Sequence, residues 1–522
     1  MEKIIFIALM ILSCCTIKAQ LSTGETPYSW SQSKGETMRR SMPVVTLPFL
    51  DMEAINKEDL ENANSLSPVR FGFPHEVNLS LSNSGVWETT ADGGRLWTLK
   101  LYSPDALSLN LLYDKFWLPD GAKFFIYSED MKQHIGAFTS QNNSGKMEDV
   151  SGFATGFLYT NNIVLEYYEP VGVIGNGIIS ITQVISGYRY IYDIVKKEKQ
   201  QRAISQYELL DCHNDINCPE GDDWLQEKNA VALMVMGEKA CTGALLNNTD
   251  IDDDTPYFLT ANHCFRNTPA SQWIFYWNYE APSCIEGAIY HTDSNKSTRG
   301  ATVLARHADT DFMFLRLTES PATNTNVIVY YLGWDTRSAS YINHAPNASC
   351  IHHPLRQQKK ISLINGISNC SDVLPWRHDN TLTYTPADTH WSADFSNGTV
   401  QEGSSGAPLL NQNKRVIGQL HGGLNGCAPI TMYFGRFDIS WNSGNLRQWL
   451  DRRNTGASFV DGRCSYGFYN RNVTTNQKIV GCDNLEVQEV NVTNGAKLIL
   501  DAPGNIRIKS FNVGLGSELR VK

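Results

Sequence analysis

Short runs of alternating apolar and polar residues recur along the chain, and this period of two predicts β-strands. In the first third the runs are RLWTLKLY, LSLNLLY, KFFIY and IVLEYYEP, all between residues 95 and 170. Turn residues such as PDGA at 119–122 separate them at the spacing of a β-sandwich. We therefore expect residues 21–205 to form a β-sandwich-like domain, with a polar arm around Ser31 before it.

Two further regions follow this domain. A solvated charge run, VKKEKQQRA at 195–203, indicates a cleavable linker before a domain over 206–463. In the last region, 464–522, VNVTNGAKLIL from Val490 aligns without gaps with FNVGLGSELRV from Phe511, a repeat of 21 residues. Such repeats predict β-solenoid coils or a small sandwich, serving in sorting or surface attachment, or only as a cap on the fold.

Residues 1–20 have the order of an export signal, with Lys3 at the positive end, an apolar core at 4–12 and a cleavage region near Gln20. Alternatively, ILSC is a lipoprotein signal that leaves Cys14 lipidated. The core is too short to span a membrane, and no later segment is expected to do so. The protein is expected to be secreted or on the outer surface of a Gram-negative bacterium. The net charge of −10, without a long basic run, argues against nucleic-acid binding.

Three segments of the central domain carry candidate catalytic residues. GSSGAP places Ser405 between glycines on a tight turn, where its hydroxyl can be exposed and its N–H can face a reacting carbonyl. PYFLTANHC places His263 at a strand end, beside a cysteine. TDFMFLRL places Asp311 at the start of an apolar strand, where a carboxylate can hold one imidazole nitrogen. Alone, each segment is better explained without catalysis, as a loop, a structural histidine or a turn.

Together the residues follow the order His263, Asp311, Ser405, as in chymotrypsin-type serine proteases. Residues 207–462 resemble the bacterial lysyl endopeptidases, a secreted trypsin-like branch, in CTGALL, TANHC, DCHNDINCPEGD, YWNY, LGWD, IHHP, GQLHGG, FGRF and DRRNTGASFVDG. This implies an all-β fold with a chymotrypsin-like double β-barrel, acting on protein or peptide substrates without a cofactor. By the resemblance, Ser405 is the nucleophile, His263 the general base and Asp311 the orienting carboxylate. The N–H groups of Gly403 and Ser405 form the oxyanion hole.

The resemblance also bears on activation. The family makes its enzymes with an N-terminal propeptide, which residues 21–205 fit; a permanent accessory domain is the alternative. Pancreatic-type zymogens pair an aspartate just before the nucleophile with a freed N-terminus, but here that position is Ser404. Activation is therefore expected to come from removal of a steric block. A protease beginning near Tyr207 is then expected to be active, once folded, whatever its first residue.

Ten of the 12 cysteines remain when the two in the export signal are set aside, and an even number in an exported chain predicts disulfides. By the resemblance, Cys212 pairs with Cys427, Cys218 with Cys284, and Cys241 with Cys264. Cys350 and Cys370 are left as an extra pair, and Cys464 and Cys482 as a pair at the start of the tail. Metal binding is not expected, because neither CxxC nor HExxH occurs.

The substrate pocket departs from the family pattern. Lysyl endopeptidases carry a lysine-binding aspartate where this chain has Met432, and trypsin has its pocket aspartate where this chain has Thr399. Because an unpaired ammonium is costly to bury against a thioether, strict lysine specificity is expected to be lost. Glu402 at the pocket rim, or Asp438, could restore a basic preference. His421 and Gly422 are expected to line the pocket.

Two other classes of function stay open from the sequence. The protein could be a catalytically silent binding or adhesion protein on the protease fold, or a surface-anchored structural protein whose β-domains carry the role. Intact His263, Asp311, Ser405 and Gly403 argue against the first of these.

Overall fold

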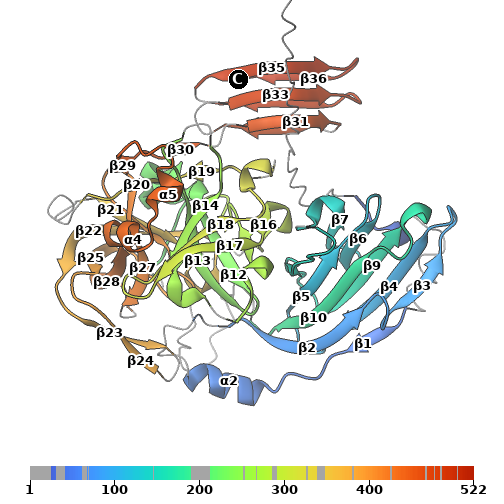
Figure 1. Ribbon diagram of the computed structural model, residues 1–522, viewed down its shortest axis with the longest axis horizontal. Coiled ribbons are helices and arrows are strands. Elements are labelled where there is room, and N and C mark those ends of the chain that lie inside the picture. Colours follow the sequence, from blue (N-terminus) through green and yellow to red (C-terminus); the bar gives the residue numbers. More distant parts are fainter. Residues whose placement is uncertain are drawn as a thin grey trace, which may run out of the picture.

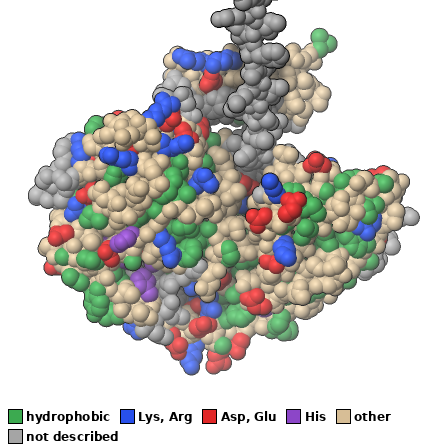
Figure 2. Space-filling model, in the orientation of Figure 1, with side chains coloured by type: hydrophobic (Ala, Val, Ile, Leu, Met, Phe, Trp, Pro, Cys, Tyr) green, Lys and Arg blue, Asp and Glu red, His purple; other side chains and the backbone are tan. Residues whose placement is uncertain are grey.

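The computed structural model describes residues 25–30, 42–61, 68, 70–144, 146–189, 212–250, 253–265, 267–284, 291–324, 327–337, 347–378, 381–423, 426–464, 467–474, 476–481, 485–502 and 504–522. The export signal, Cys14, the polar arm at Ser31 and the charged linker lie outside them. Figure 1 shows three regions: an N-terminal domain (residues 25–189, blue to teal), the protease-like domain, and a tail in red. Acidic and basic side chains are interspersed over the face in Figure 2.

The N-terminal domain is a sandwich of two sheets, as the alternating runs predict. One sheet holds β1 (Val44–Thr46), β3 (Val86–Thr89), β4 (Arg95–Tyr102), β6 (Lys123–Ser128), β7 (His134–Phe138) and β9 (Asn162–Glu169). The other holds β2 (Gly72–Ser80), β5 (Ser108–Trp117), β8 (Phe153–Ala154) and β10 (Ile178–Gly187). Inward residues of both sheets, such as Trp97, Tyr113 and Ile181, form one buried core. Helix α2 (Met52–Glu61) precedes β2.

The first half of the protease-like domain is a barrel. Its strands, in sheet order, are β16 (Ser297–Arg299), β15 (Ile274–Tyr276), β12 (Val231–Met236), β13 (Lys239–Leu246), β14 (Tyr257–Ala261), β18 (Phe312–Leu317) and β17 (Ala301–His307). The two end strands, β16 and β17, are joined directly through Gly300, whose φ of +73° suits glycine. Because β16 pairs with β15 and β17 pairs with β18, the sheet closes on itself.

The second half is also a barrel. Its closed circuit runs β26 (Pro408–Leu410), β21 (Ala348–His352), β22 (Lys360–Cys370), β25 (His390–Asn397), β28 (Ile430–Arg436) and β27 (Arg415–Gly423), and β27 pairs back with β26. β11 (Asn214–Asp215), β20 (Gly333–Asp335) and β29 (Phe459–Val460) extend this sheet, and β23 (Leu374–His378) and β24 (Thr381–Thr385) form a hairpin beside it. Helices α4 (Phe437–Ser443) and α5 (Arg447–Leu450) follow β28. The expected all-β double barrel is confirmed.

The tail is a β-solenoid rather than a sandwich. β31 (Gly467–Val473), β33 (Leu485–Val492) and β35 (Ile506–Val513) form one parallel sheet, and β32 (Gln477–Val480), β34 (Lys497–Asp501) and β36 (Glu518–Val521) form another. Val490 lies opposite Phe511 and Leu498 opposite Leu519, in the register of the 21-residue repeat. The two sheets alternate along the chain, so each repeat is one coil. No helix among the described residues is long and apolar enough to cross a membrane.

Candidate active site

Ser405 lies in the turn between β25 and β26, where the two barrels meet. The N–H of Thr242 on β13 donates to the Ser405 carbonyl at 2.8 Å, and the N–H of Gly406 donates to the Leu420 carbonyl at 2.9 Å. Gly406 has a φ of +83°, and a Cβ there would lie 2.2 Å from Thr260 Oγ1. Only glycine fits this approach, which explains its place next to the serine. The Ser405 side chain itself stays partly exposed.

His263 and Asp311 come from the first barrel and hold each other in two places. His263 sits in the 3-10 turn Asn262–Cys264 after β14, and Asp311 directly precedes β18, which pairs with β14. Asp311 Oδ2 lies 2.7 Å from His263 Nδ1, while Asp311 Oδ1 accepts the His263 backbone N–H at 2.8 Å. Both side chains are buried, and Asp311 has a φ of +53°, an uncommon conformation outside glycine. The carboxylate therefore fixes both the position and the orientation of the imidazole.

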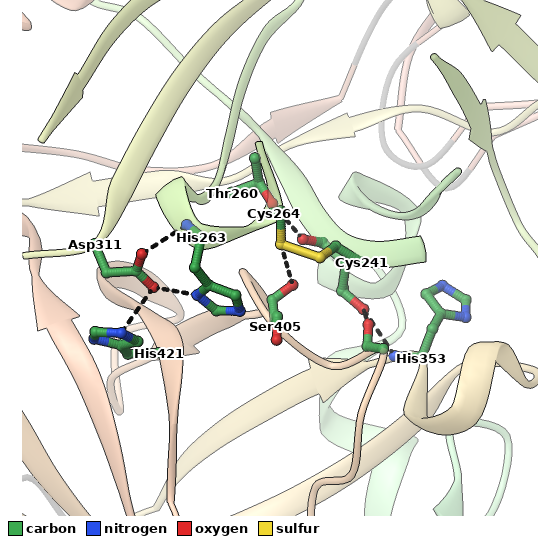
Figure 3. The surroundings of a disulfide bond; sticks show 10 residues. Cys241, Thr260, His263, Cys264, Asp311, His353, Ser405 and His421 are labelled. Carbon is green, nitrogen blue, oxygen red and sulfur yellow. Dashed lines mark hydrogen bonds and ion pairs between the residues drawn. A yellow bond between two sulfur atoms is a disulfide. The ribbon is translucent and has the colours of Figure 1, made fainter. Parts of the chain in front are cut away.

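The imidazole lies between the carboxylate and the serine. Figure 3 shows Asp311 on one side of His263 and Ser405 on the other. Nε2 of His263 is buried and has no hydrogen-bond partner among the described residues. With Nδ1 directed to Asp311, Nε2 is the nitrogen left to exchange a proton on the serine side.

A second histidine contacts the same carboxylate from the second barrel. His421, on β27, places Nε2 3.5 Å from Asp311 Oδ2 (Figure 3). The indole of Trp376, on the β23–β24 hairpin, stacks on His421 at 3.7 Å between ring centroids, and His390 lies 2.8 Å from His421 Nδ1. Burial lowers the pKa of His421 well below its usual value, so the ring is neutral at pH 7. The Asp311 carboxylate is thus closed off by buried rings.

Three of these side chains are close enough to be considered as metal ligands. Donor atoms of His263, Asp311 and His421 lie within 4.8 Å of one another and all three residues are buried. The 2.7 Å separation between His263 Nδ1 and Asp311 Oδ2 is that of a direct hydrogen bond, which occupies the atoms a metal would need. The arrangement fits proton transfer better than metal coordination.

The backbone N–H groups of Gly403 and of Ser405 itself have no acceptor in the part of the chain that the structure describes. Gly403 has a φ of +94°, and a Cβ there would lie 2.8 Å from the His353 carbonyl. The preceding carbonyl, of Glu402, accepts the Leu355 N–H at 2.6 Å. These contacts fix the peptide that carries the Gly403 N–H.

The structure contains the three disulfides implied by the resemblance: Cys212–Cys427, Cys218–Cys284 and Cys241–Cys264. The last joins β13 to the turn carrying His263, and Figure 3 shows it beside Ser405. Cys464 is disulfide-bonded, whereas Cys482 lies outside the described residues.

The expected Cys350–Cys370 bridge is wrong, because both thiols are free and buried. Cys350 lies opposite Ser362 in the β21–β22 ladder, and Cys370 is at the far end of β22, opposite His390. Eight residues of strand separate the two levels, a length of about 26 Å.

The predicted pocket residues lie around the second barrel. Met432 on β28 is buried against Gly423 on β27, where a Cβ would lie 2.3 Å from its sulfur. The buried Thr399 hydroxyl donates to the Gly426 carbonyl. Gly422, opposite Tyr433, is on the same strand as His421.

The two acids that could restore a basic preference are both near arginines. The Asp438 carboxylate binds the Arg436 guanidinium, with Nε to Oδ1 at 3.1 Å. Burial raises the pKa of Glu402, and the charge of Arg356 opposes that rise.

Sequence reasoning missed the rings around Asp311 and the support of the Ser405 loop. Trp376 belongs to the β23–β24 hairpin and His390 to β25 of the second barrel, and nothing in the linear sequence joins them to His263. Thr242 had a signal, because it follows Cys241 in the CTGALL segment. Its hydroxyl donates to the Gly403 carbonyl at 2.7 Å.

The double barrel, with His263, Asp311 and Ser405 grouped at its junction, defines the class of fold: the central domain has the architecture of chymotrypsin-like serine proteases. Residues 208–434 match the family described as lysyl endopeptidase, C-terminal domain. A lysyl endopeptidase from Pseudomonas aeruginosa is 31% identical over 205 residues, which cover 38% of this chain and 40% of that protein. The resemblance to lysyl endopeptidases is thereby confirmed for this domain.

Two solved protease structures are also similar in part. The Rv3671c protease from M. tuberculosis, in its active form, is 13% identical, with 48% of this chain and 92% of that chain covered and a TM-score of 0.30. A serine endoprotease from Yersinia pestis is 14% identical, with 43% of this chain and 64% of that chain covered and a TM-score of 0.28.

Proposed function

We propose that the protein is an exported serine endopeptidase that hydrolyses peptide bonds through an acyl-enzyme. Ser405 Oγ attacks the scissile carbonyl while His263 Nε2 takes its proton. The imidazolium then gives that proton to the leaving amine, and water repeats the sequence to release the acyl group. The observation that carries the proposal is the two-point grip of Asp311 on His263, which leaves Nε2 unpaired on the serine side.

The negative oxygen of each tetrahedral intermediate needs donors that are not already engaged. The unpaired N–H groups of Gly403 and Ser405 are suited to this role because the surrounding contacts hold them in place. His421 and Trp376 act indirectly: by excluding water they strengthen the attraction between the Asp311 carboxylate and a protonated His263.

The test is labelling by a fluorophosphonate probe together with peptide hydrolysis. The full-length protein should be labelled at Ser405. Ser405→Ala should abolish labelling, and either Ser405→Ala or His263→Ala should lower kcat by about a million-fold. Ser396→Ala, which removes an exposed hydroxyl on β25, serves as the matched control and should keep full activity. A folded wild-type protein that fails to label would instead support a silent binding protein on this fold.

We further propose that cleavage is not restricted to lysine bonds. Met432 is buried and apolar, the Thr399 hydroxyl is already engaged, and Asp438 is paired with Arg436. Burial raises the pKa of Glu402, which lies near Arg356, so a substrate ammonium would enter without a free carboxylate. Cleavage of a peptide library should favour uncharged or apolar side chains before the cut, and a profile dominated by lysine would support a lysyl endopeptidase proper.

Export and surface attachment belong to the same proposal. Three disulfides fit an oxidising compartment, and the solenoid tail could hold the enzyme at the cell surface. Fractionation of cells and medium, with and without residues 465–522, tests this. Equal release of both forms into the medium would leave the tail as a cap only.

A further inference from the structure

The loop that carries Gly403 and Ser405 is held from behind by a chain of buried side chains. Ser404 Oγ lies 2.8 Å from Nδ1 of His352, the last residue of β21. His352 Nε2 lies 3.1 Å from Ser362 Oγ on the neighbouring strand β22. Ser362 Oγ donates to the Thr399 carbonyl at 2.7 Å. All four residues are 0% exposed.

The chemistry of these groups determines where each proton lies. A carbonyl can only accept, so the single hydroxyl proton of Ser362 goes to Thr399. Ser362 Oγ must then accept from His352, which places the imidazole proton on Nε2. Burial lowers the pKa of His352 well below its usual value, so the ring is neutral and Nδ1 is an acceptor. The Ser404 hydroxyl therefore donates to His352 Nδ1.

We propose that His352 is a positioning residue for the oxyanion hole. It ties Ser404, which lies between the two proposed donor residues, to Thr399 at the other end of the same loop. In pancreatic-type zymogens, the residue before the nucleophile is an aspartate that pairs with a freed N-terminus. Here that residue is the uncharged Ser404, and the neutral hydrogen bonds through His352 hold the loop in place of the ion pair. The inference deepens the proposed function and rests on it.

The geometry explains why a side chain so far from the substrate affects catalysis. The Ser404 peptide lies between the N–H groups of Gly403 and Ser405, so rotation about it moves both donors. The carbonyl of Glu402 is held by the Leu355 N–H at 2.6 Å, in the turn that directly follows His352. Loss of the Ser404–His352 bond leaves the Thr242 hydroxyl, which donates to the Gly403 carbonyl at 2.7 Å, to hold the centre of the loop without a tether on the Ser404 side chain.

The test compares three variants of the full-length protein: Ser404→Ala, His352→Phe and the double variant. Each single variant should lower kcat by about 10- to 100-fold, the scale of a misplaced oxyanion donor, with KM changed less than about three-fold. The kcat of the double variant should be no lower than that of the worse single variant, because both substitutions break the same chain of hydrogen bonds. Ser349→Ala is the matched control: this buried serine on β21 has an unpaired hydroxyl, and its loss should leave kcat within about two-fold.

A second measurement does not depend on activity. In ¹⁵N-histidine spectra of the full chain, one imidazole should carry its proton on Nε2 down to mildly acidic pH, and Ser362→Ala should shift that resonance. An Nδ1-protonated His352, or wild-type kcat in both single variants, would overturn the inference. So would losses that multiply in the double variant. Failure of the wild-type protein to label at Ser405 would instead overturn the proposed function. The spectrum would still show whether the hydrogen bonds through His352 are present.

Discussion

The N-terminal domain and the C-terminal tail both flank the protease domain, but they are attached to it in opposite ways. The N-terminal domain shares a hydrophobic core with the first barrel. This shared core joins Phe71, Leu112, Ala154, Phe157 and Ile185 to Leu233, Val235, Ala240, Ile274, Tyr276 and Tyr279. The tail has a core built only from its own residues, such as Val487, Val492 and Leu498. The first attachment resembles a domain interior, and the second is a tether.

Polar contacts follow the same division. The N–H of Phe71 donates to the Glu238 carbonyl at 2.8 Å, and Gln272 Nε2 donates to the Tyr113 carbonyl at 2.7 Å. The tail is joined through the short pairing of β19 (Tyr330–Tyr331) with β30 (Arg463–Cys464). None of the hydrogen bonds, ion pairs or ring contacts among the described residues links the N-terminal domain to His263, Asp311 or Ser405.

Removal of the N-terminal domain is the most severe test of this difference. A protein beginning at residue 207 exposes the barrel side of the shared core, with side chains such as Leu233, Ile274 and Tyr276. Each large apolar side chain is worth about 1.5–3 kcal/mol, so the loss approaches the whole stability of a typical domain. We expect aggregation or a thermal midpoint at least about 10 °C lower.

Removal of residues 465–522 is the matched control and should shift the protease midpoint by less than about 2 °C. A soluble protein beginning at residue 207 with an unchanged midpoint would show that the shared core contributes little. The two regions would then be alike in their attachment.

Acid should destabilise the protease domain more than it destabilises the tail. Burial lowers the pKa of both His353 and His390 to about 3. A histidine held neutral in the fold binds its proton only on unfolding, so its contribution is complete above pH 6.5 and is lost as the pH falls toward 3. At pH 5 each of these two histidines should lower the free energy of unfolding by about 2 kcal/mol. The sequence of residues 464–522 has no histidine, so the tail lacks this source of acid sensitivity.

Calorimetry between pH 8 and pH 5 measures this directly. The protease transition should move down by several degrees while a separate tail transition moves less. His390→Gln should weaken the pH dependence, whereas His307→Gln, which changes a partly exposed ring, should not. A protease transition independent of pH over this range would exclude the histidine explanation.

The sequence predicts the structure of the tail better than it predicts the attachment of the N-terminal domain. The 21-residue repeat determines the register of the solenoid, because parallel coils place Val490 beside Phe511 directly. The order of His263, Asp311 and Ser405 was also readable, since motif and order are properties of the chain. The shared core was not readable, because its partners are apolar residues far apart in the chain, from 48 positions (Ile185 to Leu233) to 208 positions (Phe71 to Tyr279), that look like ordinary strand residues. The false Cys350–Cys370 pair has the same cause: counting cysteines takes no account of the register between β21 and β22.

Arg299 offers a smaller test at the junction. Its guanidinium carbon lies 4.8 Å and 5.5 Å from the ring centroids of Phe138 and Phe153 in the N-terminal domain, and Nη1 lies 3.6 Å from the Glu319 carboxylate. Arg299→Met removes the guanidinium beside the buried Glu319 carboxylate, which keeps the residue-299 backbone N–H at 2.8 Å, and should cost about 3 kcal/mol in urea unfolding at pH 7.

Burial raises the pKa of Glu319, so more of it is neutral as the pH falls, and the loss should shrink in acid. Arg316→Met removes an exposed arginine from β18 of the same barrel and should be near neutral. Equal effects of the two substitutions would mean that Arg299 contributes nothing specific to the junction.

Breaking the linker should have the smallest effect. A cleavage site inserted at 195–203 allows the chain to be cut after folding, without removing any residue of the shared core. Because the core and its hydrogen bonds remain, the two fragments should elute together in size-exclusion chromatography and separate only in denaturant. The peptidase activity should match that of the uncut protein. A free N-terminal fragment under native conditions would show that this domain, like the tail, is only tethered to the protease domain. It would favour a propeptide that is released after cleavage.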